Sequence, residues 1–485
     1  MAALVSQLVG LIGVAFATGS SPSLVQTLPL QPEHQWFMPL QGALGQVCRS
    51  GFPLFSTTSN HAQVSDHDLS TASLKAQISM VPAGARDALA SFLVAALRSV
   101  RDFYGATDAE GTYAEFRAMV TVHVELHKLY STQDGNGDYA YPCLNGLVVE
   151  VCHRLVELSA NAAALSTAPI RDERSSRQIK DTTRQCVEKS LQVSAAHMNP
   201  AEWNSELNRN DSVGDIVWEL GNILWRQYAQ RRLHQQATEL AKTFGALQPS
   251  ERDRLDGRGF MVAQSTLAQS YYWRGRLGVV LLDFRQSRDW LERAWKACPE
   301  DGWQQRRAIL IRLIPVALLL GKLPTLEVLQ DYDLEEPFGP LIDAFRTGNV
   351  AAWRQLLDTH REWLRARSIW LLLFERGEIL VWRNLFRKAL QIYYETDANA
   401  TKNRPPTWVF TTAAAQAFEG TGELEDGSVA LEDIICVLSS LIDQGLVLGQ
   451  LSYASRNLVM RPAEDGMGGF PRIADVRPRT VQAIK

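Results

Sequence analysis

Apolar residues recur every three or four positions along most of the chain, and this spacing is typical of helices that bury one face. In the first part of the chain it predicts helices over residues 4–17, 86–104, 113–129, 144–165 and 182–196. Turn-rich or charged stretches separate these helices. We therefore expect an N-terminal helical region, residues 1–180, to which no motif assigns a function.

From about residue 213 the pattern becomes pairs of shorter helices joined by short turns. Such pairs bury their apolar faces against neighbouring pairs, which predicts a solenoid of degenerate tetratricopeptide-like repeats over residues 181–370. The predicted helices are 216–229, 233–244, 261–273, 284–298, 306–320, 340–347 and 351–365.

The last quarter of the chain has a different order of elements. The pattern predicts one long helix over 371–394, a short strand at 408–410, helices over 412–419 and 430–444, and two strands at 447–451 and 457–461. This order is that of a winged helix, here residues 371–461, and the Gly- and Pro-rich residues 462–485 are expected to form a flexible tail. The predicted fold class is an all-α solenoid that ends in a winged-helix domain.

Composition and charge narrow the function classes. Hydrophobic residues make up 46% of the 485-residue chain and charged residues 21%, which excludes intrinsic disorder, collagen and disulfide-scaffold classes. The six cysteines form no CxxC pair, so we expect buried free thiols. The net charge of −4 provides no global field for nucleic acid, and any such contact needs a local basic patch.

The apolar stretch over residues 4–17 resembles part of a signal peptide. However, no Lys or Arg precedes Arg49, and Gln7 interrupts a run that is too short to span a bilayer. These features favour the first helix of a packed domain over secretion.

Motifs that carry chemistry are absent or incomplete. His123 and His127 share one helix face, but Glu125 does not follow the first histidine as a zincin requires, and no third ligand is evident. Residues 134–138 begin like a calcium loop, but lack its later glycine and glutamate. We predict no catalytic residue, no metal and no cofactor, and keep an enzyme that uses the two histidines as an alternative.

Several motifs occur in order along the second half of the chain. They include Tyr271-Tyr-Trp-Arg-Gly275, Leu341-Ile-Asp-Ala-Phe-Arg-Thr-Gly-Asn349, Ile369-Trp-Leu-Leu-Leu-Phe-Glu-Arg376 and Val381-Trp-Arg-Asn-Leu-Phe-Arg-Lys388. Together they resemble the PCI-domain family of proteasome-lid, signalosome and initiation-factor subunits, over about residues 180 to 461. Within it, the chain resembles the PCI subunit of the transcription-export complex 2, with the twelfth-subunit-like signalosome protein as a close relative.

The resemblance implies a non-enzymatic scaffold of mRNA export that couples transcription to export, in the nucleus at the envelope or pore and partly in the cytoplasm. Its implied partners are a large helical scaffold subunit, a small acidic disordered subunit shared with the proteasome lid, and RNA or single-stranded nucleic acid bound without sequence preference. No membrane and no small-molecule substrate are implied. The alternative is a PCI subunit of a signalosome, proteasome-lid or splicing-linked assembly that does not bind RNA.

Basic residues cluster in the region where such a surface would form. Residues 361–404 contain nine Lys or Arg and only five Asp or Glu, and the predicted wing adds two arginines. Arg383 and Asn384 are expected to hold the joint between solenoid and winged helix. The helix 430–444 contains no Lys or Arg, which disfavours sequence-specific duplex binding. The candidate nucleic-acid residues are Arg387, Lys388, Lys402, Arg404, Arg456 and Arg461.

Aromatic residues recur at helical spacing along the same joint. Trp370, Phe374, Trp382 and Phe386 are the candidate partner-binding residues. Most of them are expected to lie in the core, with one or two exposed for a partner. Residues 261–284 form a second candidate surface for the scaffold subunit, although core packing is the alternative there as well.

Overall fold

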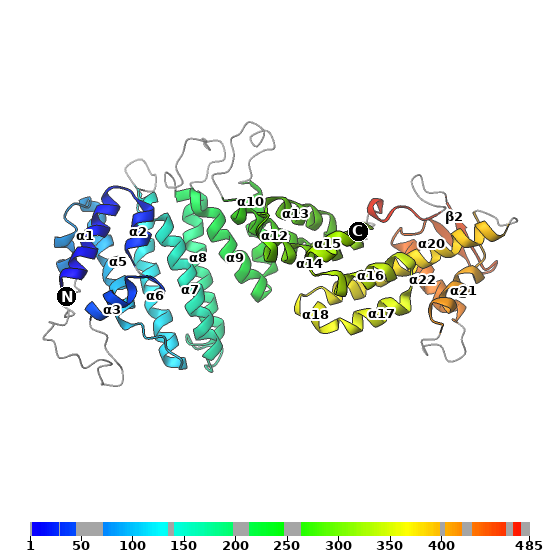
Figure 1. The fold of residues 1–485 in the computed structure, drawn as a ribbon, viewed down its shortest axis with the longest axis horizontal. Helices are drawn as coiled ribbons and strands as arrows, with labels where there is room; N and C mark the ends of the chain where they lie inside the picture. The colour runs from blue at the N-terminus through cyan, green and yellow to red at the C-terminus, as the bar shows by residue number, and fades with distance from the viewer. Residues whose placement is uncertain are drawn as a thin grey trace, which may run out of the picture. The chain divides into compact units, whose positions relative to one another are not determined.

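The computed structural model describes nine stretches of the chain, and the fold is drawn in Figure 1. These stretches are residues 2–28, 30–44, 71–133, 140–196, 213–246, 263–397, 403–419, 429–461 and 469–476. The chain divides into two compact units, Met1–Trp273 and Arg274–Lys485. The calcium-like loop 134–138 and Lys402 lie outside the described residues.

The N-terminal unit is built from helices in its described residues, and α5 to α9 stand side by side in chain order (Figure 1). Short helices α2, α3 and α4 were not predicted from the sequence. The helices are α1 (Ala2–Ala17), α2 (Ser21–Thr27), α3 (Phe37–Leu44), α4 (Thr71–Gln77), α5 (Ala83–Asp102), α6 (Ala109–Tyr130), α7 (Asn145–Leu165), α8 (Ser176–Ala196), α9 (Val217–Arg231) and α10 (His234–Ala246), followed by α12 (Gln264–Val280), which crosses the unit boundary.

Helix α1 forms where the apolar pattern predicts it. It buries Val9, Ile12 and Phe16 and contacts α2, α3 and α4, while Leu11 on its other face is exposed. Burial of one face explains the helical spacing, since that spacing places the apolar side chains on one stripe. In the part of the chain that is described, no helix has the length and apolarity that crossing a membrane requires.

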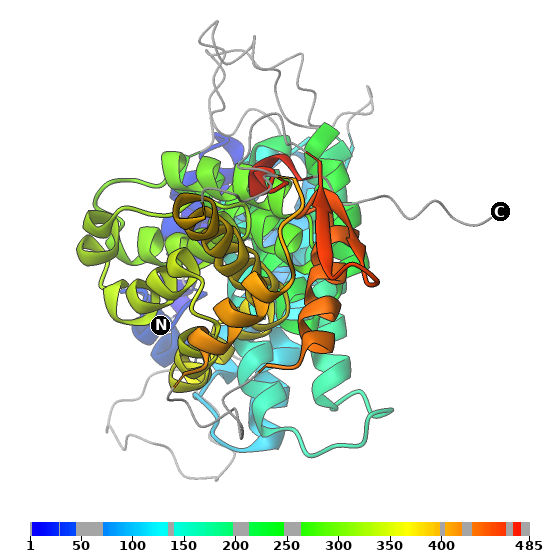
Figure 2. The same cartoon turned by 90° about the vertical axis from the view of Figure 1, so that its right-hand side faces the viewer.

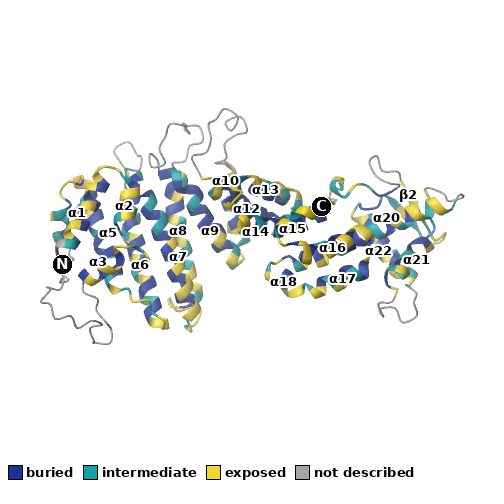
Figure 3. Ribbon diagram, in the orientation of Figure 1, coloured by how far each residue is buried: buried dark blue, intermediate teal, exposed yellow. Residues whose placement is uncertain are grey.

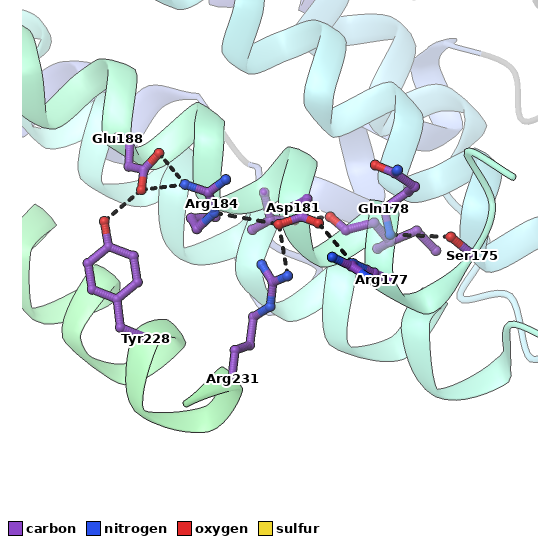
Figure 4. A network of polar contacts seen from close by, with 10 residues as sticks. Ser175, Arg177, Gln178, Asp181, Arg184, Glu188, Tyr228 and Arg231 are labelled. Atoms are coloured by element: carbon purple, nitrogen blue, oxygen red, sulfur yellow. Dashed lines mark hydrogen bonds and ion pairs between the residues drawn. The ribbon is translucent and has the colours of Figure 1, made fainter. Parts of the chain in front are cut away.

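A network of charged side chains ties α8 to α9 (Figure 4). The Asp181 carboxylate lies 2.8 Å from Arg231 and 3.6 Å from Arg184, and Arg184 also contacts Glu188 at 2.7 Å. The Tyr228 hydroxyl donates a hydrogen bond to Glu188 at 2.6 Å. The predicted boundary between residues 180 and 181 therefore falls inside α8, at the start of this network.

The first part of the C-terminal unit consists of consecutive helices that pack in pairs, α13 with α14 and α16 with α17. One continuous stretch over 370–396 follows, in which a π turn separates α19 from α20, where the sequence predicted a regular helix. The elements are α13 (Phe284–Ala297), α14 (Trp303–Leu319), α15 (Leu326–Asp331), α16 (Glu335–Thr347), α17 (Val350–Thr359), α18 (Arg361–Ala366), α19 (Trp370–Leu372), the π turn η4 (Leu373–Gly377) and α20 (Glu378–Thr396).

The unit continues as a winged helix made of α21 (Trp408–Ala417), α22 (Leu431–Asp443), β1 (Gly449–Ser452) and β2 (Asn457–Met460). The two strands are antiparallel, with Gly449 opposite Met460. Figure 2 shows this hairpin beside the last helices, and α22 contacts β1. The structure thus confirms the predicted all-α fold that ends in a winged helix.

The predicted strand at 408–410 is wrong, because these residues begin α21. The extended segment lies just before them. The amide of Met460 donates to the carbonyl of Asn403 at 2.9 Å, and the amide of Leu458 donates to the carbonyl of Pro405 at 3.0 Å. Consecutive prolines at 405 and 406 favour extended backbone, so the segment lies along β2 before the helix starts.

The last described residues, 469–476, form a strap across the C-terminal unit. Phe470 is 1% exposed and belongs to the hydrophobic core. The amide of Leu448 donates to the carbonyl of Gly469 at 2.7 Å, and the Arg285 guanidinium donates to the carbonyl of Val476 at 3.2 Å. This part of the segment expected to be a flexible tail is therefore packed, and its other residues lie outside those described.

Burial follows the apolar stripes of the helices, as Figure 3 shows. Four described cysteines are buried as expected, and desolvation raises the pKa of Cys152 to about 12. Cys436 was expected to be buried and is exposed, because it lies on the outer face of α22 while Ile434 and Leu438 face inward.

Candidate functional site

Helix α20 organises the candidate site in the C-terminal unit. It turns Val381, Trp382 and Phe386 into the core and leaves Arg387 and Lys388 exposed. The two cations are consecutive, and both fall on the side of α20 that lies away from the buried stripe of Val381, Trp382 and Phe386.

Arg383 and Asn384 connect α20 to its neighbours. The Asn384 amide donates a 2.9 Å hydrogen bond to the carbonyl of Phe345 at the end of α16. Arg383 is 4% exposed and donates to the Asn384 side chain at 3.0 Å and to the carbonyl of Pro471 in the strap. Burial, aided by the nearby Arg387 charge, lowers the pKa of Arg383 to about 10, so it remains protonated at neutral pH.

The wing carries the other described candidate cations. Arg404 lies within the extended segment beside β2, Arg456 ends the hairpin turn with a φ of 50°, and Arg461 follows β2. All three are exposed. The Thr407 hydroxyl donates to the carbonyl of Arg456 at 3.0 Å, which fixes the turn against the extended segment.

The structure therefore sorts the predicted basic residues into two groups. Arg404 and Arg456 are brought to one edge of the wing by the pairing of residues 403–407 with β2 and the turn. Arg387 and Lys388 instead line a separate cleft beside α20, and no residue of the wing lines that cleft. Their roles in binding nucleic acid stay predictions.

Sequence reasoning missed one residue on the wing. Tyr453 stands at the hairpin turn with 68% of its surface exposed, close in sequence to Arg456. An exposed aromatic ring among cations is what single-stranded nucleic acid uses for base stacking. The predicted hairpin turn around 452–456 was the signal that could have identified it.

Helix α22 occupies the position that reads a major groove in many winged helices. Glu432 and Asp433 stand exposed in its first turn and Asp443 at its end. Three exposed carboxylates would repel phosphates, so this face does not suit duplex DNA.

The four predicted partner-binding aromatics divide into two pairs. Trp370 is half-buried and Phe374 is 45% exposed, and their rings stack with centroids 4.9 Å apart. Trp382 and Phe386 are in the core, where the ring centroids of Phe386 and Phe410 lie 5.1 Å apart. The prediction is thus corrected for Trp382 and Phe386, because the winged helix covers the face of α20 on which they lie.

Cations surround the exposed aromatic pair. The guanidinium groups of Arg361 and Arg365 lie over the Trp370 ring, 5.0 and 5.5 Å from its centroid. Leu371, with 56% of its surface exposed, extends the apolar surface beside Phe374. We call Trp370, Leu371 and Phe374 the aromatic patch. An apolar centre with cationic borders suits a partner that carries both apolar and acidic side chains.

The histidine pair of the N-terminal unit forms a structural contact in which His123 is buried and His127 is half-buried. His123 and His127 stack with centroids 5.9 Å apart, and the His123 ring shares a 2.9 Å hydrogen bond with Ser190. Burial first, then the charges of His127 and Lys189, lowers the pKa of His123 to about 3. Among the described residues, no group of three potential ligands that could hold a metal includes this pair.

Comparison with known proteins found relatives in several eukaryotes. A PCI domain-containing protein of Schizosaccharomyces pombe is 31% identical over 276 residues, 56% of this chain and 58% of that protein. A PCI domain-containing protein 2 homolog of Dictyostelium discoideum is 28% identical over 202 residues, 42% of each chain. A CSN12 homolog of Gibberella zeae is 30% identical over 208 residues, 41% of this chain and 43% of the relative.

The chain matches about half the length of these relatives. No protein-family model matches it. The relatives are nevertheless named as PCI domain-containing proteins and a CSN12 homolog, and the fold of this chain combines paired helices with a terminal winged helix. On these grounds the chain is similar to proteins of the PCI-domain family over about half of its length.

Proposed function

We propose that this protein is a non-catalytic scaffold subunit of a nuclear mRNA-export complex that couples transcription to export. In that role it binds a large helical scaffold subunit and a small acidic subunit, and its wing binds RNA without sequence preference. It acts in the nucleus, at the envelope or pore. The observation that carries the proposal is the contrast between the basic, aromatic wing and the acidic face of α22.

The wing suits single strands for a physical reason. Arg404, Arg456 and Arg461 can neutralise phosphates, and the exposed Tyr453 ring can stack on a base. Such contacts follow the backbone and do not read base edges, so affinity depends strongly on salt and weakly on sequence. The acidic α22 supports the same conclusion, since it disfavours insertion into a duplex groove.

The aromatic patch is the proposed contact for the small acidic subunit. A disordered acidic segment can place an apolar side chain against Leu371 and Phe374 while its carboxylates approach Arg361 or Arg365. Desolvated aromatic anchors carry most of the binding energy at such interfaces, and the surrounding charges provide steering.

A second candidate function is a PCI subunit of a signalosome-like assembly that does not bind RNA. The similarity to a protein named as a CSN12 homolog supports this alternative. Purification of the tagged protein from its own cells, with mass spectrometry of what accompanies it, separates the two. Export and nuclear-pore proteins support the first function, and signalosome, proteasome or splicing subunits without them support the second.

RNA binding is tested by reversing the wing charges together, in the triple variant Arg404→Glu, Arg456→Glu, Arg461→Glu. We expect the affinity of the full chain for single-stranded RNA to fall by about a hundredfold at physiological ionic strength, since each lost phosphate contact is replaced by repulsion. The control is Glu432→Gln with Asp433→Gln, which should leave RNA binding unchanged or slightly stronger. Equal affinity of the triple variant and the unaltered chain would refute RNA binding by the wing.

A further inference from the structure

A cleft of about 640 Å³ lies in the C-terminal unit beside α20. Its walls come from the turn after α14, the end of α16, one face of α20 and the strap 469–476. Phe345 and Phe470, both buried, form part of the lining. The volume is in the range of small-molecule sites.

The charge of the cleft is all of one sign. Its lining residues include six cations and no Asp or Glu: Lys322, Arg346, Arg383, Arg387, Lys388 and Arg472. One of them, Arg346, lies 3.0 Å from the exposed Asp343 carboxylate outside the cleft. Like charges held together repel one another, so a bound anion would relieve a cost that the fold otherwise bears.

Arg383 forms a fixed base for this cluster. It is 4% exposed, lies 5.8 Å from the Phe470 ring centroid, and is held by Asn384 and the carbonyl of Pro471. Its Nε has no hydrogen-bond partner among the described residues. Buried polar groups are normally paired, and an unused N–H donor here calls for an acceptor.

The exposed cations are brought together by tertiary structure. Arg387 and Lys388 stand on the α20 face that also carries Asn384 and Gln391. Arg472 reaches the cleft from the strap, which Arg285 anchors. The side chains of Lys322, Arg387, Lys388 and Arg472 form no ion pair with any residue in the described stretches.

We propose that this cleft binds a small molecule that carries several phosphate groups. Cations placed around a concavity from four elements match a compact polyanion, and arginine forks bind phosphate through paired N–H groups. An extended nucleic-acid backbone instead follows a long groove or an open edge such as the wing. The proposal goes beyond the scaffold function. The ligand chemistry fits both a free polyphosphorylated metabolite and the headgroup of a phosphoinositide lipid.

The test uses the full chain at physiological ionic strength. Calorimetric titration with inositol hexakisphosphate probes the free ligand, and sedimentation with vesicles of phosphatidylcholine, with or without phosphatidylinositol bisphosphate, probes the headgroup. We expect saturable binding in at least one arm, and the arm that binds identifies the source. The absence of saturable binding in both would overturn the proposal.

The site is located with the double variant Arg387→Gln, Arg472→Gln, since both residues are exposed. We expect it to weaken phosphate binding by at least about tenfold. The matched control Arg404→Gln, Arg461→Gln removes the same charge from the wing and should change phosphate binding by less than about twofold. Thermal unfolding checks that both variants fold.

The same variants separate this site from RNA binding. Loss of RNA binding in the wing variant, with phosphate binding retained, supports two independent sites. Equal weakening of phosphate binding by cleft and wing variants would contradict the proposal, because it would mean diffuse attraction to net charge. A cleft variant that loses RNA binding while no phosphate probe binds would also contradict it, and would assign the cleft to the nucleic-acid surface.

Discussion

Two neighbouring parts of one helical stretch carry the same aromatic spacing with opposite burial. Trp370 and Phe374 stand four residues apart and stack at an interplanar angle of 13°, with Phe374 45% exposed. Trp382 and Phe386 have the same spacing, are tilted at 48°, and are buried. Spacing places two rings on one helix face, but what packs against that face decides whether they stabilise the fold or stay available to a partner.

The π turn between the two pairs contributes to this difference. It inserts an extra residue into the helical repeat over residues 373–377, which shifts the face that follows. Gly377 ends the turn, and a Cβ atom there would lie 2.4 Å from Cζ2 of the buried Trp353. The close approach of this backbone to the Trp353 ring thus requires glycine.

The largest expected difference between the two pairs is in stability. Phe386→Ala removes a fully buried ring that packs on Phe410, and should destabilise the C-terminal unit by about 3–5 kcal/mol. Phe374→Ala truncates an exposed ring and should cost less than about 1 kcal/mol. Urea unfolding followed by tryptophan fluorescence measures both. Similar midpoints for the two variants would mean that the comparison is wrong.

The second expected effect concerns the π turn. Gly377→Ala should destabilise the unit by about 1–3 kcal/mol, because the Trp353 ring must move in a packed core. The control is Gly10→Ala in α1, where no atom from elsewhere in the described structure lies within 4 Å of a new Cβ. There, helix propensity should make the change neutral or stabilising by up to about 1 kcal/mol. Thermal unfolding of both variants checks this, and a stable Gly377→Ala protein would show that the turn tolerates a side chain.

The smallest expected effect on stability accompanies the largest on partner binding. Leu371→Ala with Phe374→Ala should leave the unfolding midpoint nearly unchanged, because both side chains are more than two-fifths exposed. It should weaken capture of the small acidic subunit by about tenfold to a hundredfold, if the aromatic patch is the anchor we propose. Quantitative co-purification measures this. The control is Val459→Ala, which truncates an exposed apolar side chain on the wing. Equal capture of the acidic subunit by both variants would show that the aromatic patch is not part of the interface.

The fold could be read from the sequence to the extent that it depends on local spacing. The apolar repeat located α5 to α9 and α22, because each buries one stripe along its length. Short helices such as α15 were not predicted, because six residues show little periodicity. The π turn was not predicted either, because one extra residue in a helix barely changes the apolar spacing. The strand predicted at 408–410 was wrong because the extended backbone lies at the prolines, Pro405 and Pro406. The β-prone residues Trp408, Val409 and Phe410 that come after them begin a helix.

For the candidate site, the sequence determined which residue types stand where along each helix. It placed Arg387, Lys388, Trp382 and Phe386 on one helix, and Trp370 and Phe374 on the helical stretch just before it. It also showed that the helix that became α22 carries acidic residues and no Lys or Arg. Only the tertiary structure decided that Phe386 is covered and Phe374 is not, and that Lys322, Arg346 and Arg472 join α20 around one cleft. The physical reason is that helix spacing is fixed by contacts a few residues apart, whereas burial and charge clusters arise from segments that meet only when the chain packs.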